Sequence, residues 1–269
     1  MAVVLAQGWL CALMAFVIVL LALREFYGLL EAQGYKIFSV AGMISAVAFL
    51  GGSFYFLRFH PGAEASFEVF LFAGALMVFF VNQMRFPIEE KIPLESIAYT
   101  MFGLLYIPWL FNFVTKIVFI ELPDASGNLV GISYTVFLLV ATKFGDMGAY
   151  VFGSLFGRHK LIPHVSPGKT WEGFAGALAS SLMGGLAVYA FYGPERMPAL
   201  HNWWIVGILS LVLSVVSVAG DLAESVIKRS TLSKDSGHVL PGIGGTMDLI
   251  DSLLFTAPLL YLYLCLATS

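Results

Sequence analysis

The chain has 269 residues, of which 59% are hydrophobic and 12% are charged, and its mean hydropathy is +0.88. A soluble domain carries about a quarter charged residues, so this composition excludes an ordinary soluble protein and indicates a membrane protein. The formal net charge of −3 indicates little by itself, and we expect no nucleic acid among the partners.

Several apolar runs reach the roughly 20 residues that a helix needs to cross the hydrocarbon core of a bilayer. We predict transmembrane helices at residues 3–23, 37–57, 67–84, 96–120, 130–156, 171–192, 203–227 and 247–267. Because the connectors are short, we expect one all-α, polytopic membrane domain over 1–269, with about eight (eight to nine) transmembrane helices. Within it, N-terminal helices occupy 1–125, and catalytic helices with cytoplasmic loops occupy 130–269.

Lysine and arginine are distributed unevenly between the connecting segments. If the N-terminus lies outside, only Arg58 and Arg196 fall in segments on the outer side, while Lys116 and Lys143 fall inside spans. The remaining basic residues are Arg24, Lys36, Arg85, Lys91, Arg158, Lys160, Lys169, Lys228, Arg229 and Lys234. Cytoplasmic segments of membrane proteins are enriched in Lys and Arg, so we expect these ten to mark the cytoplasmic side and the chemistry to be supplied from the cytosol.

One carboxylate is predicted at membrane depth. Asp146, in "KFGDMGAYVFG", lies about 11 residues, or roughly 16 Å, inside the cytoplasmic end of its span. Ionisable groups at this depth are costly and are functional candidates by default. Lys143 is three residues earlier on the same helical face, where it can neutralise the carboxylate. A structural ion pair therefore stays open beside a functional role.

The segment 220–252, "GDLAESVIKRSTLSKDSGHVLPGIGGTMDLIDS", holds eight of the chain's charged residues. Asp221 and Glu224 are one turn apart near the cytoplasmic end of the seventh span, and Asp248 and Asp251 repeat this spacing at the start of the last. Carboxylates on one helix face repel each other unless a cation or proton lies between them. Hard oxygen ligands suit Mg²⁺, which completes its shell with water and phosphates. We favour Asp221 and Asp248 as Mg²⁺ ligands, with a second cation left open; the alternative is that Asp248 only caps a helix.

Basic and glycine residues in the same segment are suited to phosphate. Lys228, Arg229 and Lys234 match phosphate oxygens, and glycines at a helix start let backbone amides approach an anion. The loop 157–173, "GRHKLIPHVSPGKTWEG", adds basic and hydroxyl side chains: Arg158, Lys160, Ser166, Lys169 and Thr170. Basic clusters beside a membrane often only set topology or bind headgroups. Here acids alternate with the bases, which favours a metal and phosphate site at the membrane surface.

Two long motifs, in the correct order, resemble the phosphatidate cytidylyltransferases, also called CDP-diacylglycerol synthases. The first is "GDMGAYVFGSLFGRHKLIPHVSPGKTWEGFAG" at 145–176, and the second is "SVIKRSTLSKDSGHVLPGIGGTMDLID" at 225–251. The stretch "REFYGLLEAQG" at 24–34 is similar to a segment that follows an early span in that family. The similarity covers most of the chain and is densest from residue 145 onward.

The resemblance implies a nucleotidyltransferase of phospholipid biosynthesis in the bacterial inner (cytoplasmic) membrane, with its active site facing the cytoplasm. It would transfer a cytidylyl group from CTP to phosphatidic acid, giving CDP-diacylglycerol and pyrophosphate. CTP, phosphatidic acid and the lipid bilayer would be its partners, and a homodimer is a family expectation only. The implied catalytic residues are Asp221, Lys228, Arg229, Asp248 and Asp251, with Asp221 and Asp248 as metal ligands. The implied substrate-binding residues are Asp146, Ser166, Lys169, Thr170, Lys234, Asp235, Gly244 and Gly245.

The sequence departs from the family pattern at three positions around this site. Ile243 replaces the usual His, Leu249 the usual Arg, and Gly168 the first lysine of "SPKKT". Two interpretations of these departures stay open: a subfamily that binds the phosphates with other residues, or an enzyme with weakened activity. Family members commonly have one further span before the position of "REFYG", so we expect this chain to lack it or to begin late.

Three other functions remain as alternatives. The motifs do not read the lipid tail, so a CTP-dependent transferase acting on another lipid phosphate stays open. Intramembrane acids and glycine-broken helices also occur in secondary transporters, although no paired inverted halves are visible and the charge lies at the cytoplasmic edge. An inactive member of the family acting as a scaffold is the third. Turnover of CTP with added magnesium separates an active transferase from the last two.

Overall fold

The computed structural model describes residues 2–88, 92–120, 130–231 and 245–268. In these residues eight helices are long and apolar enough to cross a membrane, which confirms the predicted all-α, polytopic fold. The helices are α1 (Ala2–Ala32), α2 (Ser39–Phe59), α3 (Glu64–Gln83), α4 (Ile92–Leu104), α5 (Leu110–Val118), α6 (Gly131–Phe156), α7 (Trp171–Arg196), α8 (Trp203–Ser230) and α9 (Thr246–Thr268). A π-helical turn, η1 (Leu105–Trp109), joins α4 to α5, so that these three form one span.

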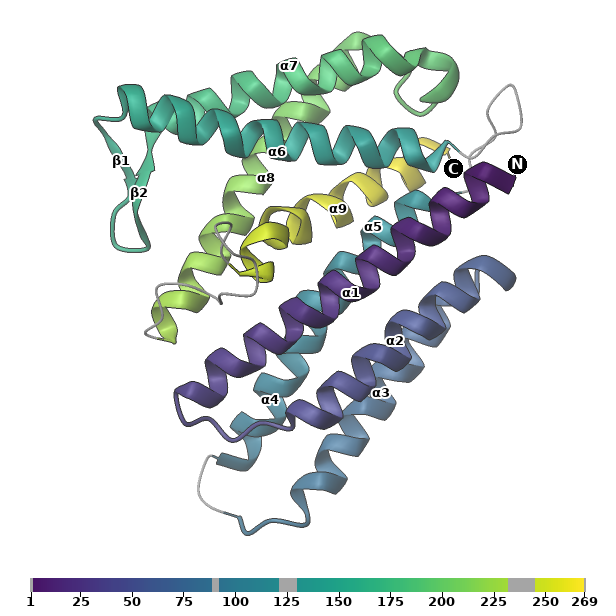
Figure 1. Cartoon of the computed structure of the whole chain (residues 1–269), viewed down its shortest axis with the longest axis vertical. Coiled ribbons are helices and arrows are strands. Elements are labelled where there is room, and N and C mark those ends of the chain that lie inside the picture. Colours follow the sequence, from purple (N-terminus) through teal and green to yellow (C-terminus); the bar gives the residue numbers. More distant parts are fainter. Residues whose placement is uncertain (1, 89–91, 121–129, 232–244, 269) are drawn as a thin grey trace. The chain divides into compact units, whose positions relative to one another are not determined.

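The described chain divides into two compact units. Of the described residues, those within 116–229 and 250–269 and those within the first eight form the C-terminal unit, and those within 9–115 and 230–249 form the N-terminal unit. Figure 1 shows the elements that each unit contains, coloured along the sequence.

The N-terminal unit is built around α1 to α5. Tyr27 of α1 is buried, and its hydroxyl donates a hydrogen bond to the Thr100 carbonyl of α4 at 2.7 Å. Glycine is needed at Gly42 and Gly103, because a Cβ atom at either position would lie 2.5 Å from the Tyr27 side chain. Small residues of this kind allow close helix packing in membranes, where the hydrophobic effect does not drive helices together.

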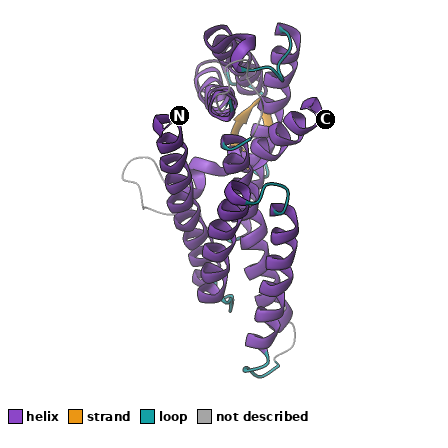
Figure 2. Cartoon of the chain, turned by 90° about the vertical axis from the view of Figure 1, so that its right-hand side faces the viewer, coloured by secondary structure: helices purple, strands orange, loops and turns teal. Residues whose placement is uncertain are grey.

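The C-terminal unit is built around the helix pair α6 and α7, which lie side by side along much of their length (Figure 1). Glycines bring the two backbones close: a Cβ at Gly173 would lie 2.8 Å from the Ala149 carbonyl, and one at Gly176 would lie 2.5 Å from the Phe152 Cβ. The connection between them is an antiparallel hairpin of β1 (Lys160–Ile162) and β2 (Ser166–Thr170), the strands drawn in orange in Figure 2.

Two features differ from the sequence-based expectation. The first helix continues to Ala32 rather than ending at residue 23, because "LREFYGLLEA" keeps an apolar helical face that packs in the unit's core. The β hairpin at 160–170 was not predicted, because "KLIPHVSPGKT" contains two prolines and a glycine and shows no regular alternation of apolar residues.

Candidate functional site

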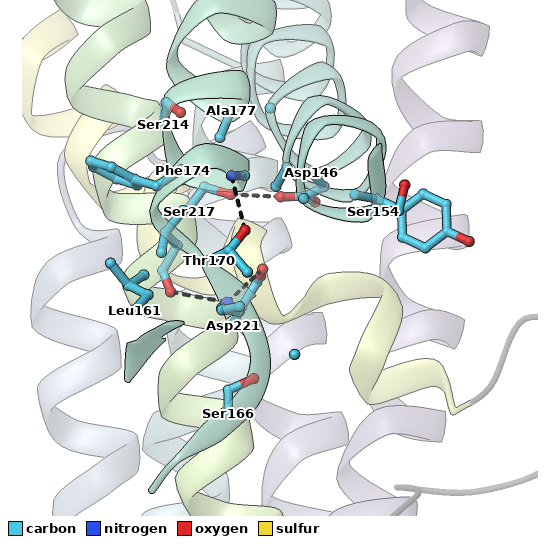
Figure 3. Close-up of a pocket in the computed structure, with 18 residues that line it drawn as sticks. Asp146, Ser154, Leu161, Ser166, Thr170, Phe174, Ala177, Ser214, Ser217 and Asp221 are labelled. Carbon is cyan, nitrogen blue, oxygen red and sulfur yellow. Dashed lines mark hydrogen bonds and ion pairs between the residues drawn. The ribbon is translucent and has the colours of Figure 1, made fainter. Parts of the chain in front are cut away.

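The C-terminal unit contains a cavity of about 420 Å³ between α6, the hairpin, α7 and α8. Figure 3 shows the side chains that line it. Five predicted substrate-binding or catalytic residues line this one cavity: Asp146, Ser166, Lys169, Thr170 and Asp221. The structure therefore brings together residues that lie up to 75 positions apart in the sequence.

An ion pair joins the hairpin to α8. The Lys169 ammonium lies 3.0 Å from Asp221 Oδ2 and 3.4 Å from the Val218 carbonyl, and both side chains are about three-quarters buried. Since a largely buried pair of this kind is less screened than one on the surface, Lys169 is held with its charge directed at the Asp221 carboxylate. A phosphate or a cation that enters the cavity therefore meets both signs of charge at one point.

The hairpin is fixed at its base by the first turn of α7. The Glu172 carboxylate accepts hydrogen bonds from the backbone amides of Arg158 and His159 at 3.1 and 3.3 Å, and it lies 2.7 Å from His159 Nδ1. The Thr170 hydroxyl accepts a hydrogen bond from the Gly173 amide at 3.1 Å and so caps the N-terminus of α7. Thr170 lines the cavity, but its observed partner is a helix end.

Asp146 connects three helices of the C-terminal unit. On α6 it pairs with Lys143 at 3.0 Å, as the sequence predicted. Ser217 of α8 donates to Asp146 Oδ1 at 2.9 Å, and Ser252 of α9 donates to Oδ2 at 3.1 Å. Lys143 also donates to the Ser252 hydroxyl at 2.9 Å. The predicted ion pair is therefore present, and Asp146 in addition lines the cavity.

More carboxylates gather where α8 meets α9. A Cβ atom at Gly220 would lie 2.7 Å from the Asp251 carbonyl, so glycine permits this close crossing. Asp251 and Glu224 are buried, at 7% and 5% exposure, and interact with each other through their side chains. Lys228 lies 3.2 Å from Glu224 Oε1. Asp221 is near enough to Asp251 and Asp146 to experience their negative charge.

Arg229, at the end of α8, contacts the hairpin. Its Nε donates to the Val165 carbonyl at 3.4 Å, and the residue is exposed. Arg229 is thus next to the turn between β1 and β2, whereas Lys228 is directed toward a carboxylate of its own helix. The two adjacent basic residues that the sequence treats as one phosphate-binding pair have different surroundings.

The start of α9, in the N-terminal unit, is held by two carboxylates. Glu25 of α1 accepts hydrogen bonds from the Thr246 and Met247 amides, both at 2.9 Å, and is 9% exposed. Asp248 Oδ2 accepts from the Gly245 amide at 3.0 Å, which is the helix-capping interaction left open by the sequence. Asp221 and Asp248 belong to different units, so their pairing as metal ligands stays a prediction.

Three predicted substrate-binding residues, Lys234, Asp235 and Gly244, lie outside the described residues, and so does Ile243. Gly168 is described, and a Cβ at this position would meet nothing within 4 Å. Leu249 is 37% exposed at the first turn of α9.

Several polar residues of these sites were not singled out in the sequence. Ser217, Ser252 and Glu172 hold charged or backbone groups around the cavity, and Glu25 lies in "REFYG" at the end of a predicted span. Ser217 and Asp221 are four residues apart on one helix face, and this spacing was a usable signal. The contact of Ser252 with Asp146 could not be predicted in this way, because it depends on the relative positions of α6 and α9.

The donor chemistry near Asp221 suits a hard cation. Carboxylate oxygens are the ligands that Mg²⁺ prefers, and Asp221 already attracts one cationic group, the Lys169 ammonium. Within the described residues no group of three or more His, Cys, Asp or Glu side chains is arranged to enclose a metal ion. Mg²⁺ commonly binds through one or two carboxylates and takes its other ligands from water and substrate phosphates, so the residues present fit this ion.

Comparisons with known proteins agree with the motifs. The model described as "Cytidylyltransferase family" matches residues 1–267. A phosphatidate cytidylyltransferase of Staphylococcus epidermidis is 33% identical over 271 residues, covering 97% of this chain and 92% of the relative. Proteins of the same name from Staphylococcus saprophyticus and Staphylococcus aureus are each 33% identical, with the same coverage. The chain therefore belongs to the cytidylyltransferase family.

Proposed function

We propose that the protein is a phosphatidate cytidylyltransferase, which transfers a cytidylyl group from CTP to phosphatidic acid and releases pyrophosphate. The observation that carries this proposal is the single cavity in which Lys169, Asp221 and Asp146 meet, in a chain that matches the family along nearly its whole length. The two substrates, phosphatidic acid and CTP, are inferred from the name of the relatives, phosphatidate cytidylyltransferase.

The chemistry requires two anions to come together. An oxygen of the lipid phosphate attacks the α-phosphorus of CTP and forms an O–P bond. The bond between the α-phosphorus and the oxygen that bridges it to the β-phosphate breaks, and pyrophosphate leaves. No covalent enzyme intermediate is needed. The main demand on the protein is electrostatic, since charge repulsion must be offset as the phosphates approach.

The residues of the cavity answer this demand in different ways. Lys169 provides a positive charge that is fixed by the hairpin and α7, and it can transfer from the Asp221 carboxylate to a phosphate oxygen. Ser166 and Gly168 lie on the same strand and line the cavity next to it. Arg229 is not one of the cavity-lining residues, but it contacts the hairpin turn, and in this proposal it would hold the outer phosphates of the nucleotide. Asp146 positions α8 and α9 through Ser217 and Ser252.

A magnesium ion at Asp221, with Asp251 or Asp248 as a further ligand, would supply positive charge to the α-phosphate and the lipid phosphate. Among the described residues of the C-terminal unit, Asp251 is the neighbouring carboxylate of α9. Asp248 remains the ligand that the family motif implies.

We further propose that the cavity opens on the cytoplasmic side of the inner membrane. The supporting observation is the position of the basic residues. The segment between α6 and α7 contains Arg158, Lys160 and Lys169, and the last turn of α8 contains Lys228 and Arg229. Lys and Arg are enriched in cytoplasmic segments. CTP then arrives from the cytosol and phosphatidic acid from the bilayer. A homodimer remains a family expectation.

The test is release of pyrophosphate by the purified protein in detergent, with CTP, phosphatidic acid and MgCl₂. We expect turnover that requires all three and that falls at least about 100-fold in Asp221→Asn. Lys160→Gln, an exposed residue of the same hairpin that does not line the cavity, is the matched control and should retain activity. Folded protein that does not turn over CTP with any lipid phosphate would reject the proposal in favour of a scaffold or a transporter.

A further inference from the structure

Ser214 of α8 has a buried hydroxyl that the proposed chemistry does not use. The residue is 1% exposed, and its Oγ has no hydrogen-bond partner among the described residues. Other serines of the helix are partnered: Ser210 and Ser225 donate to the carbonyls four residues earlier, and Ser217 donates to Asp146. Because an unpaired buried hydroxyl is costly and uncommon, its presence at a cavity wall points to a ligand.

The hydroxyl lies at one end of the cavity. Ser214 precedes Asp221 by two helical turns on the same face of α8, which corresponds to about 10 Å along the helix. In Figure 3 Ser214 is near Ala177, toward the opposite end of the labelled side chains from Ser166, with Asp221 between them. A Cβ at Gly145 would lie 3.6 Å from Ser214 Oγ. Around the hydroxyl the wall is small or apolar.

Two observations assign this end to the lipid rather than to the nucleotide. The C-terminal end of α8 carries Lys228 and Arg229 at the membrane surface, so Ser214 lies deeper in the bilayer than Asp221. The cavity also reaches Tyr150, which is 78% exposed on α6, a helix that spans the membrane. An exposed face of such a helix contacts lipid. A lipid can therefore enter the cavity from the side, beside Tyr150, which lies nearer the hairpin end of α6 than Gly145. The apolar end at Ser214 would then receive the part of the lipid below its phosphate.

We propose that the Ser214 hydroxyl donates a hydrogen bond to an ester carbonyl of the lipid substrate, and that it selects diacyl lipids over their dialkyl ether analogues. This inference rests on the proposed function, because the phosphate must be held near Lys169 and Asp221. An ester carbonyl is a strong acceptor located a few bonds below the phosphate, on the bilayer side. An ether analogue has no carbonyl, so it leaves the hydroxyl unpaired, and the unpaired group reduces affinity.

The experiment compares two lipids of equal chain length, diacyl phosphatidic acid and 1,2-dialkyl phosphatidic acid, in the parent protein and in Ser214→Ala. Pyrophosphate release at saturating CTP and Mg²⁺ gives KM and kcat for each lipid. In the parent we expect the KM for the ether lipid to be about fivefold higher, as for the loss of one neutral hydrogen bond. In Ser214→Ala the two KM values should become equal, with kcat and the KM for CTP unchanged.

Two further variants separate this role from a general effect of substitution. Ser214→Thr keeps the hydroxyl and should keep the preference for the diacyl lipid. Ser210→Ala removes a buried hydroxyl of the same helix that is bonded to the Val206 carbonyl and does not line the cavity, so it should leave the preference unchanged. Thermal unfolding of each variant in detergent confirms that the proteins compared are folded.

The outcomes are distinct. Equal KM values for the two lipids in the parent, or a preference that survives in Ser214→Ala, overturn the inference and leave the proposed function intact. A rise in the KM for CTP in Ser214→Ala also overturns it, because the hydroxyl then faces the nucleotide. Absence of turnover with both lipids in the folded parent protein rejects the proposed function itself, and with it the substrate to which this inference refers.

Discussion

The Ser217 hydroxyl of α8 donates a hydrogen bond to Asp146 Oδ1 of α6 over 2.9 Å. The other oxygen of the same carboxylate receives Lys143 and Ser252. One carboxylate thus links α8 and α9 close to the positions of Asp221 and Asp251 on those helices. Asp146, which the sequence indicates as a functional candidate, thereby helps to position α8 and α9.

Replacing Asp146 by Ala should lower both stability and activity. The substitution leaves Ser217 and Ser252 without their acceptor and Lys143 without its counter-ion, and we expect unfolding to become easier by about 2 kcal/mol and kcat/KM to fall at least tenfold. Thermal unfolding in detergent and pyrophosphate release measure the two effects. The double variant Lys143→Met with Asp146→Leu leaves no unpaired charge, so it should recover stability without activity. Full activity in Asp146→Ala would contradict the positioning role.

Lys169→Gln should strengthen the binding of a divalent cation while weakening catalysis. Because the lysine ammonium occupies Asp221 Oδ2 at 3.0 Å, its removal frees the carboxylate from an ion pair worth about 1 kcal/mol, or about fivefold in affinity. Mn²⁺ binding followed by electron paramagnetic resonance, without substrate, measures this change. Lys160→Gln, an exposed residue on β1, is the control. Unchanged or weaker Mn²⁺ binding in Lys169→Gln would show that metal and lysine do not share Asp221.

Glu25→Ala should destabilise the protein although Glu25 lies more than 200 residues from its partners in sequence. The Thr246 and Met247 amides would lose their acceptor, at a cost of about 2 kcal/mol. Chemical or thermal unfolding measures the loss. Glu31→Ala, exposed on the same helix, should change stability by less than about 0.5 kcal/mol. Equal stability of the two variants would rule out a role for Glu25 in holding α9.

Gly220→Ala should reduce activity by separating α8 from α9. Its Cβ would lie 2.7 Å from the Asp251 carbonyl, which is backbone and cannot rotate away. We expect a loss of about 1–3 kcal/mol in stability, as for an overpacked core, and a fall in kcat. Gly207→Ala on the same helix is the control, because its Cβ would meet only Leu182 Cδ1 at 3.4 Å. Similar behaviour of both variants would contradict the close crossing.

Gly168→Lys should be tolerated and should improve nucleotide binding. The position lines the cavity and has open space around its Cβ, and the family motif has a lysine there. A second ammonium beside Lys169 is expected to lower the KM for CTP by about threefold to tenfold. Steady-state kinetics at varied CTP measure the effect, and Gly168→Gln controls for side-chain size. A raised KM in the lysine variant would indicate that this chain holds its phosphates elsewhere.

Much of the membrane fold was predictable from the sequence, because apolar runs of sufficient length leave few alternatives in a bilayer. The ion pair of Lys143 with Asp146 was also predictable, since helical periodicity places residues three apart on one face. The hairpin at 160–170 was not, because it depends on anchoring by Glu172 and on no pattern of its own residues.

The site was predictable in part. Sequence motifs identified Asp146, Lys169 and Asp221, which the structure brings to one cavity. They did not identify Ser214, Ser217 or Ser252, since serine in a membrane helix usually bonds to its own backbone. Ser210 and Ser225 bond to the backbone of their own helix in this way. Only the three-dimensional packing distinguishes the three other serines from them.

No loop separates β2 from α7: the strand ends at Thr170 and the helix begins at Trp171, and Glu172 binds the two residues just before β1 to the same turn. The hairpin is therefore joined to α7 without an intervening loop, and we expect Lys169 to follow a movement of α7. The tilt of a transmembrane helix responds to the thickness of the surrounding bilayer. In an enzyme of this design, the position of the ammonium that faces Asp221 would then depend on the membrane around the protein.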